Sequence, residues 1–229
     1  MNTFKEIIST LKENARPDQL AGMKRFGMST ENRLGLSMPF LRKMAKEIGQ
    51  DHELALKLWE TGIAEARILA GLVDDPKMLT DQQMEDWVKD IDSWDVCDQL
   101  CMNLFEKSPL AWKKINEWVK RPEEFVKRTA FSLLACLSWH DKNNEDKKFI
   151  ELFPLIVQAS TDERNFVKKS VNWALRNIGK RDLNLNKAAI VSAMQIKKLD
   201  SKAARWIAND AIRELESEAV RKRLKEFRE

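Results

Sequence analysis

The sequence predicts an all-α fold, and three observations support this prediction. The 229-residue chain is 43% apolar and 33% charged, which suits a globular protein with a substantial core. Its 7 glycines and 6 prolines are too few for the many tight turns of a β-sandwich or barrel. Strong helix formers (alanine, leucine, lysine and glutamate) are abundant, whereas runs of β-branched residues are scarce.

Apolar residues recur at helical spacing along the whole chain, and polar turns separate the periodic segments. Pro39, Pro109 and Pro122 fall near expected helix starts, where proline is tolerated. Residues 27–39 form the one long polar loop, and no linker divides the chain, so we expect a single domain over residues 1–229. The expected helices are 2–14, 17–27, 37–49, 51–61, 64–74, 80–91, 94–106, 109–120, 123–139, 145–159, 163–179, 184–197, 201–215 and 217–228.

Two segments in the second half of the chain resemble each other. EEFVKRTAFSLLACL (123–137) and RNFVKKSVNWALRNI (164–178) share Phe-Val-Lys at a separation of 41 residues. Further segments on either side carry a basic residue in the same register, which gives the series Arg67, Arg128, Lys169 and Arg205. Helix pairs that recur at roughly this interval are typical of HEAT or armadillo repeats. The sequence thus predicts a HEAT/armadillo-like repeat solenoid, an α-α superhelix.

The charge is distributed unevenly along the chain. The formal net charge is +4, but the first 110 residues carry 14 Lys and Arg against 19 Asp and Glu, and the remainder carries 26 against 17. A basic second half suits a polyanionic partner. In stacked repeats the basic register would line a concave groove, where each phosphate contact adds affinity and salt sensitivity. The alternative is that these residues form local ion pairs, for example Arg67 with Glu65 and Asp74.

Other features argue against membrane insertion and metal chemistry. No stretch approaches the roughly 20 apolar residues of a membrane span, and the N-terminal MNTFKEIIST is too charged for a secretory signal. We therefore expect a cytoplasmic protein. The cysteines Cys97, Cys101 and Cys136 are interpreted as free thiols, and His52 and His140 lie in unrelated segments. Neither a metal nor another cofactor is expected.

The segment IDSWDVCD, residues 91–98, contains the first candidate for chemistry. A helix here places Trp94 and Asp98 one turn apart on the same face. A carboxylate beside an indole can hold a cation against an aromatic wall, or the pair can be an ordinary half-buried helix face. Since a buried carboxylate needs a partner, a structural pair between Asp98 and Arg128 is a further alternative.

A second aromatic candidate lies in a basic helix. Trp173 follows Lys168 and Lys169 and precedes Arg176, and an indole in such a helix can pack on a sugar or a base. Core packing explains the five tryptophans that sit among apolar residues at helical spacing, which are Trp59, Trp87, Trp112, Trp118 and Trp139.

In combination and order, these motifs resemble the HEAT-like alkylpurine DNA glycosylases of the AlkD type. SWDVCD is similar to the Trp-x-x-x-Asp motif of that family, with Trp94 and Asp98 in the matching places. FVKRTAFSLL resembles the segment with the active-site arginine, here Arg128, and FVKKSVNWALR the segment with a second indole, here Trp173. The resemblance extends to MKRFGM and LGLSMPFLRKMAK near the N-terminus and so covers most of the chain.

The resemblance implies a monofunctional glycosylase of base excision repair. Such an enzyme hydrolyses the N-glycosidic bond of cationic N3- or N7-alkylated purines in duplex DNA and needs no metal. Asp98 would stabilise the oxocarbenium-like sugar and position or deprotonate the attacking water. Trp94 and Trp173 would flank the deoxyribose, and Arg128 would hold the adjacent phosphate and orient Asp98.

The same resemblance implies a DNA-binding surface. Phe26 stands where related sequences can carry a tyrosine, so a hydroxyl contact to DNA is lost. The alternative function is a non-catalytic HEAT-like module that binds nucleic acid or a protein partner. In either case we expect a monomer. The predicted DNA contacts are Phe26, Arg128, Lys168, Lys169, Arg176 and Arg205.

Overall fold

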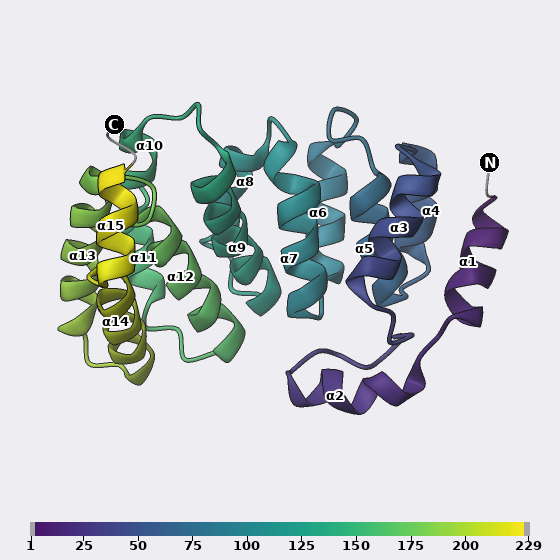
Figure 1. The fold of residues 1–229 in the computed structure, drawn as a ribbon, viewed down its shortest axis with the longest axis horizontal. Coiled ribbons are helices and arrows are strands. Elements are labelled where there is room, and N and C mark those ends of the chain that lie inside the picture. Colours follow the sequence, from purple (N-terminus) through teal and green to yellow (C-terminus); the bar gives the residue numbers. More distant parts are fainter. Residues whose placement is uncertain (1–2, 227–229) are drawn as a thin grey trace. The chain divides into compact units, whose positions relative to one another are not determined.

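The computed structural model describes residues 3–226, and every regular element in that range is a helix (Figure 1). The all-α prediction is therefore confirmed. The chain consists of two compact units, Met1–Trp112 and Lys113–Glu229. Within the described range, no helix has both the length and the apolar character needed to cross a membrane.

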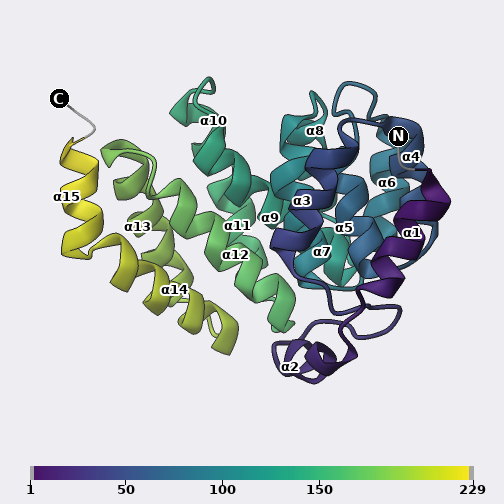
Figure 2. The same ribbon diagram turned by 45° about the vertical axis from the view of Figure 1, so that its right-hand side comes forward.

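The first unit contains two layers of helices (Figures 1 and 2). One layer is formed by α3, α5 and α7, since α5 packs against both others; α4 packs against α5 from the second layer. Trp59 of α4 stacks on Trp87 of α6, with ring centroids 4.2 Å apart, so these two helices are neighbours. The elements are α1 (Phe4–Glu13), η1 (Pro17–Gln19), α2 (Leu20–Arg25), α3 (Met38–Ile48), α4 (His52–Glu60), α5 (Ala64–Val73), α6 (Asp81–Asp90), α7 (Trp94–Asn103) and η2 (Phe105–Lys107).

The close approach of α5 and α7 depends on one small residue. A Cβ atom on Gly71 of α5 would lie 2.7 Å from Cδ2 of Leu100 on α7. From its other turns α7 buries Val96, Cys97 and Cys101. Because this side of α7 faces the core, the opposite side, which carries Trp94 and Asp98, remains partly open to solvent.

The polar loop between α2 and α3 is held by a buried carboxylate. Glu65 of α5 is 1% exposed and accepts hydrogen bonds from three consecutive backbone N–H groups, those of Leu34, Gly35 and Leu36. Gly35 has φ +81, and a Cβ atom there would lie 2.2 Å from the carbonyl oxygen of Arg16. The loop therefore has a fixed path although it contains no helix or strand.

The second unit is organised around α12. This helix packs against α9 and α14, and α11 packs against both α12 and α13 (Figures 1 and 2). The amide of Asn177 on α12 donates to the backbone carbonyl of Ala135 on α9 at 3.1 Å. The elements are α9 (Glu124–His140), α10 (Asp146–Ile150), α11 (Phe153–Ala159), α12 (Asn165–Ile178), α13 (Leu183–Lys197), α14 (Lys202–Leu215) and α15 (Glu218–Glu226); α8 (Ala111–Trp118) begins in the first unit and ends in the second.

Two expectations about the helices need correction. The expected helix 145–159 is divided into α10 and α11, because Pro154 at the start of α11 has no N–H and its ring would clash with the carbonyl of Ile150 in a continuous helix. The repeat interval is also uneven: α9 and α12 begin 41 residues apart, but α5 and α7 begin 30 apart. The expected starts and ends at residues 2, 227 and 228 lie outside the described residues.

Candidate nucleic-acid interface

The first helical turn of α7 presents an indole and a carboxylate on one half-exposed face. The helix begins at Trp94, so Asp98 follows one turn later, and both residues are partly accessible. The buried residues Cys97 and Leu100 point to the other side. Trp94 thus differs from the core tryptophans Trp59 and Trp87, which are each 4% exposed.

The orientation of the Trp94 ring is fixed from the end of α2. Its indole Nε1 donates a hydrogen bond to the backbone carbonyl of Phe26 at 3.1 Å. Phe26 itself is 65% exposed, and the guanidinium of Arg25 lies over its ring. The first unit therefore presents two accessible aromatic side chains, Phe26 and Trp94, which are connected through the Phe26 carbonyl, and Asp98 follows Trp94 one helical turn later.

Arg33 connects the loop to α7 and was not predicted as a site residue. Its guanidinium forms a bidentate ion pair with Asp95, at 2.7 and 2.9 Å, and its Nε donates to the carbonyl of Ser29. Ser93, directly before α7, donates to Asp95 and accepts from the backbone N–H of Ser29. Arg33 therefore positions the beginning of α7. An arginine within a polar loop gives no sequence signal for this role.

In the second unit, α12 carries three of the aromatic and basic residues that were predicted to contact DNA or the deoxyribose. Lys169, Trp173 and Arg176 lie on one face at intervals of four and three residues, and Val171 and Leu175 are buried on the other. Lys169 is exposed and Trp173 is partly exposed. Arg176 forms ion pairs with Asp210, at 3.3 Å, and with Glu214 of α14, so part of its charge is neutralised within the fold.

A second exposed indole next to α12 was missed by the sequence analysis. Trp206 of α14 is 41% exposed, and the ammonium of Lys168 lies 5.1 Å from its ring centroid. The neighbouring Arg205 is exposed and forms a surface ion pair with Asp200, at 3.4 Å. An available signal was the sequence Arg205-Trp206, in which an indole directly follows a predicted DNA contact.

Arg128 occupies a more enclosed position than its predicted place in a groove suggests. It is 5% exposed, and its Nη1 donates to the backbone carbonyl of Phe166 at 2.9 Å, so it connects α9 to the first turn of α12. A phosphate contact at this residue would have to use the small accessible part of the guanidinium.

Arg67 does not pair with the partners expected from the sequence. Its guanidinium bonds to the carbonyl and carboxylate of Asp90 and lies 4.9 Å from the ring centroid of Trp59. Glu65 instead holds the loop, and Asp74 bonds to His52. Arg67 thus forms an ion pair as expected, but the partner is distant in sequence and the partners named for it are wrong. Glu65 lies on the opposite side of α5, and Asp74 follows the end of the helix, two turns after Arg67.

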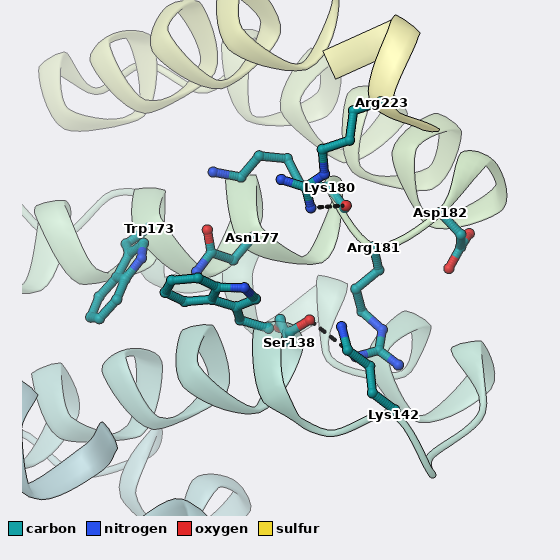
Figure 3. Close-up of a pocket in the computed structure, with 9 residues that line it drawn as sticks. Ser138, Lys142, Trp173, Asn177, Lys180, Arg181, Asp182 and Arg223 are labelled. Atoms are coloured by element: carbon teal, nitrogen blue, oxygen red, sulfur yellow. Dashed lines mark hydrogen bonds between the residues drawn. The ribbon is translucent and has the colours of Figure 1, made fainter. Parts of the chain in front are cut away.

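A cavity of about 470 Å³ opens at the end of α12 (Figure 3). The figure shows Trp173 at one side, the basic side chains of Lys142 and Arg181 at the other, and Asn177 between them. The wall also contains Trp139, which is 59% exposed. The prediction that Trp139 belongs to the core is therefore wrong. Trp139 is the penultimate residue of α9, and it lines the cavity, where it is exposed, instead of packing in the core.

Each unit thus gathers part of the predicted site. The first unit places Phe26, Trp94 and Asp98 near one another, and α12 of the second unit aligns Lys169 with Trp173. The assembly of Asp98 with Arg128 and Trp173 into one catalytic centre stays a prediction. Among residues 3–226, no group of His, Cys, Asp and Glu side chains has an arrangement that could hold a metal ion.

Comparisons with known proteins concern the fold and the family of the chain. Among solved structures, one described as "A new family of proteins related to the HEAT-like repeat DNA glycosylases with affinity for branched DNA structures" aligns with a TM-score of 0.76 and 19% identity over 96% of this chain and 95% of that chain. A designed armadillo repeat protein aligns with a TM-score of 0.41 and 16% identity over 81% and 79% of the two chains. The first likeness confirms the HEAT-like fold.

A search of curated proteins finds no match. The model of a family described as "DNA alkylation repair enzyme" matches residues 7–215.

Proposed function

The chain belongs to the DNA alkylation repair enzyme family, and from this premise we propose that it is a monofunctional DNA glycosylase. The proposed reaction is hydrolysis of the N-glycosidic bond of N3- and N7-alkylated purines in duplex DNA. The observation that carries the proposal is the half-exposed pair of Trp94 and Asp98 on α7, which lies inside the family match. No metal or other cofactor takes part in the proposed reaction.

The chemistry requires little from the protein beyond placing a negative charge correctly. An alkylated purine is already a cationic leaving group, so its departure leaves positive charge on the deoxyribose. A carboxylate at Asp98 would stabilise that charge and orient or deprotonate the incoming water. The indole of Trp94, held by its hydrogen bond to the Phe26 carbonyl, would present an electron-rich face to the same sugar.

The second unit would contribute the phosphate contacts and the other indole. In the proposed complex, Trp173 flanks the deoxyribose from α12 and Arg128 holds the adjacent phosphate. The exposed side chains of Lys169 and Arg205 are free of the strong ion pairs that engage Arg176, which favours them as phosphate contacts. The proposed partner is duplex DNA with alkylated bases, bound by a monomer in the cytoplasm.

The decisive experiment replaces the proposed catalytic carboxylate. We expect Asp98→Asn to lower the release of 7-methylguanine from methylated duplex DNA by about 100-fold or more, because removal of one preorganised charge-stabilising group has an effect of this order. Binding of undamaged duplex DNA should remain nearly unchanged, which gel shift or fluorescence anisotropy can measure. Asp92→Asn, at an exposed carboxylate two residues before α7, is the matched control and should retain activity.

A second candidate function is a non-catalytic DNA-binding module. The solved structure aligned over 96% of the chain is described as related to glycosylases and as having affinity for branched DNA, which is a binding property. The wild-type protein distinguishes the candidates: if it binds DNA but releases neither 3-methyladenine nor 7-methylguanine from defined substrates, the glycosylase proposal is rejected in favour of the binding module.

A further inference from the structure

The cavity in the second unit combines an accessible indole with several cations. Trp139 is 59% exposed although one side of its ring stacks on His140, with centroids 4.9 Å apart. Lys142, Arg181 and Arg223 reach the same cavity from the turn after α9, the turn after α12 and α15 (Figure 3). An indole surface next to clustered positive charge is the combination with which proteins bind unpaired nucleotides.

Among the residues that line the cavity, Asp182 carries a carboxylate, and it accepts the backbone N–H of Leu185 at the start of α13. Lys180, which also lines the cavity, pairs with Glu214 of α14 at 2.7 Å. Burial would raise the pKa of Glu214, but Lys180 and Arg176 outweigh this effect and lower it, so this carboxylate is ionised and neutralises its basic partners. Lys142 and Arg181 have different surroundings from Lys180.

The hydrogen bonds of Arg181 go to uncharged groups. Within the described part of the chain, its hydrogen-bond acceptors are backbone carbonyls, of Ser138 at 3.0 Å and Asp141 at 2.5 Å, and its guanidinium lies 4.3 Å from the Phe149 ring centroid. These partners are uncharged. Burial, followed by repulsion from Arg181 and Arg223, lowers the pKa of Lys142. An anion in the cavity would relieve this repulsion.

We propose that this cavity binds an unpaired nucleotide of a DNA strand, with the base stacked on Trp139 and the phosphate held among Lys142, Arg181 and Arg223. A base pair inside a duplex has neighbours on both faces and cannot stack on the indole, and an end pair is wider than a single base, so the site favours a single-stranded end or branch. The cavity volume of about 470 Å³ lies in the usual range for one small ligand. The cavity also contains Trp173, which the proposed excision reaction uses, but the nucleotide contacts inferred here are made by other side chains and do not depend on excision.

The experiment compares two DNA duplexes of the same paired sequence, one blunt and one with a five-nucleotide single-stranded overhang. We expect the wild-type protein to bind the overhang duplex about tenfold more tightly, measured by fluorescence anisotropy at fixed salt concentration. Trp139→Ala should remove most of this preference, because one base–aromatic stack has an effect of this size, and Trp139→Phe should restore part of it. Lys142→Ala should weaken overhang binding several-fold.

Controls separate this site from general electrostatic binding. Lys187→Ala removes an equal charge from an exposed position of α13 and should leave the overhang preference intact. Since Trp139 is largely exposed, its variants should fold, and an unchanged Tm would verify this. Asp98→Asn should abolish excision while it retains the preference, so that failure of the proposed function and failure of this site give different results.

Three results would overturn the inference. The first is equal affinity of the wild-type protein for blunt and overhang duplexes. The second is a preference that survives Trp139→Ala together with Lys142→Ala. The third is a response of the Trp139 indole N–H signal in NMR spectra to free dAMP but not to a single-stranded pentanucleotide, which would assign the cavity to a free nucleotide instead of a DNA strand.

Discussion

At the scale of single residues, three aspartates of the first unit have different surroundings. Asp18 is exposed and paired with Arg16, and this hydrogen-bonded pair, with Gln19, lowers the pKa of Asp18 to about 2. Asp74 is buried, and its burial raises its pKa in spite of hydrogen bonds from His52 and Gln83. Asp98 differs from both, since it lies half-exposed beside an indole, where a carboxylate can meet a cationic ligand.

The first prediction concerns the titration of Asp18. Because its pKa is lower in the folded state, the pair with Arg16 stabilises the fold above the ordinary pKa near 4, and this contribution disappears as the pH falls through about 2. NMR titration of the Asp18 carboxyl carbon should give a pKa of about 2 in the wild type. In Arg16→Ala the value should move back towards that of an ordinary aspartate; a value that stays near 2 would contradict the assigned cause.

The second prediction concerns the ion pair between the buried Arg33 and Asp95. The side chain of Arg33 is 2% exposed, so removal of its partner leaves a buried charge without compensation. We expect Asp95→Ala to lower the free energy of unfolding by about 3 kcal/mol. Asp92→Ala, three residues earlier at an exposed position, should change it by less than about 0.5 kcal/mol in chemical denaturation. Equal effects of the two changes would mean that the pair does not hold α7.

At the scale of elements, the loop before α3 has a path as well defined as that of a helix. It contains no regular structure, yet Glu65, Arg33 and Gly35 fix its path, and it connects the exposed Phe26 to the start of α7. The segment of α10 and α11 is the opposite case, in which a sequence with helical periodicity does not form one continuous helix. There the apolar periodicity continues, but Pro154 interrupts the backbone hydrogen bonding and divides the helix.

The third prediction tests the loop with two glycines. Gly35→Ala places a Cβ at φ +81 and 2.2 Å from the Arg16 carbonyl oxygen, and we expect a loss of about 1–3 kcal/mol in unfolding free energy. Gly22→Ala is the matched control, because Gly22 lies within α2 and no atom is within 4 Å of the added Cβ. It should be neutral or stabilise by up to about 1 kcal/mol. Similar denaturation midpoints for both variants would show that the loop accommodates the added Cβ atom of Gly35→Ala without strain.

At the scale of the whole molecule, the basic residues are concentrated in the second unit. Under the proposed function, its exposed lysines and arginines would contact phosphates and supply affinity without reading the base sequence. Affinity of this kind depends strongly on salt concentration. The specificity for damage would instead come from the few aromatic and acidic side chains near Asp98.

The fourth prediction measures this salt dependence. If Lys169 contacts one phosphate, Lys169→Ala should reduce the slope of log K against log salt concentration by about 0.9, because one fewer counterion is released. Arg128→Ala should reduce it by a similar amount if its small accessible part reaches a phosphate. Lys187→Ala is the control for loss of charge alone. An unchanged slope in Lys169→Ala would place this lysine outside the DNA contact.

The sequence by itself determined the helical class and the division into helix pairs, because apolar periodicity and the scarcity of glycine and proline are local properties. It also determined the pairing of Trp94 with Asp98 and of Lys169 with Trp173, since residues four apart share a face of any helix. Only the tertiary structure decided that Trp139 is exposed, that Arg67 bonds to Asp90 and that Arg33 holds the start of α7. These outcomes depend on which distant segments pack together, and the apolar pattern of one helix does not specify which helices it will contact.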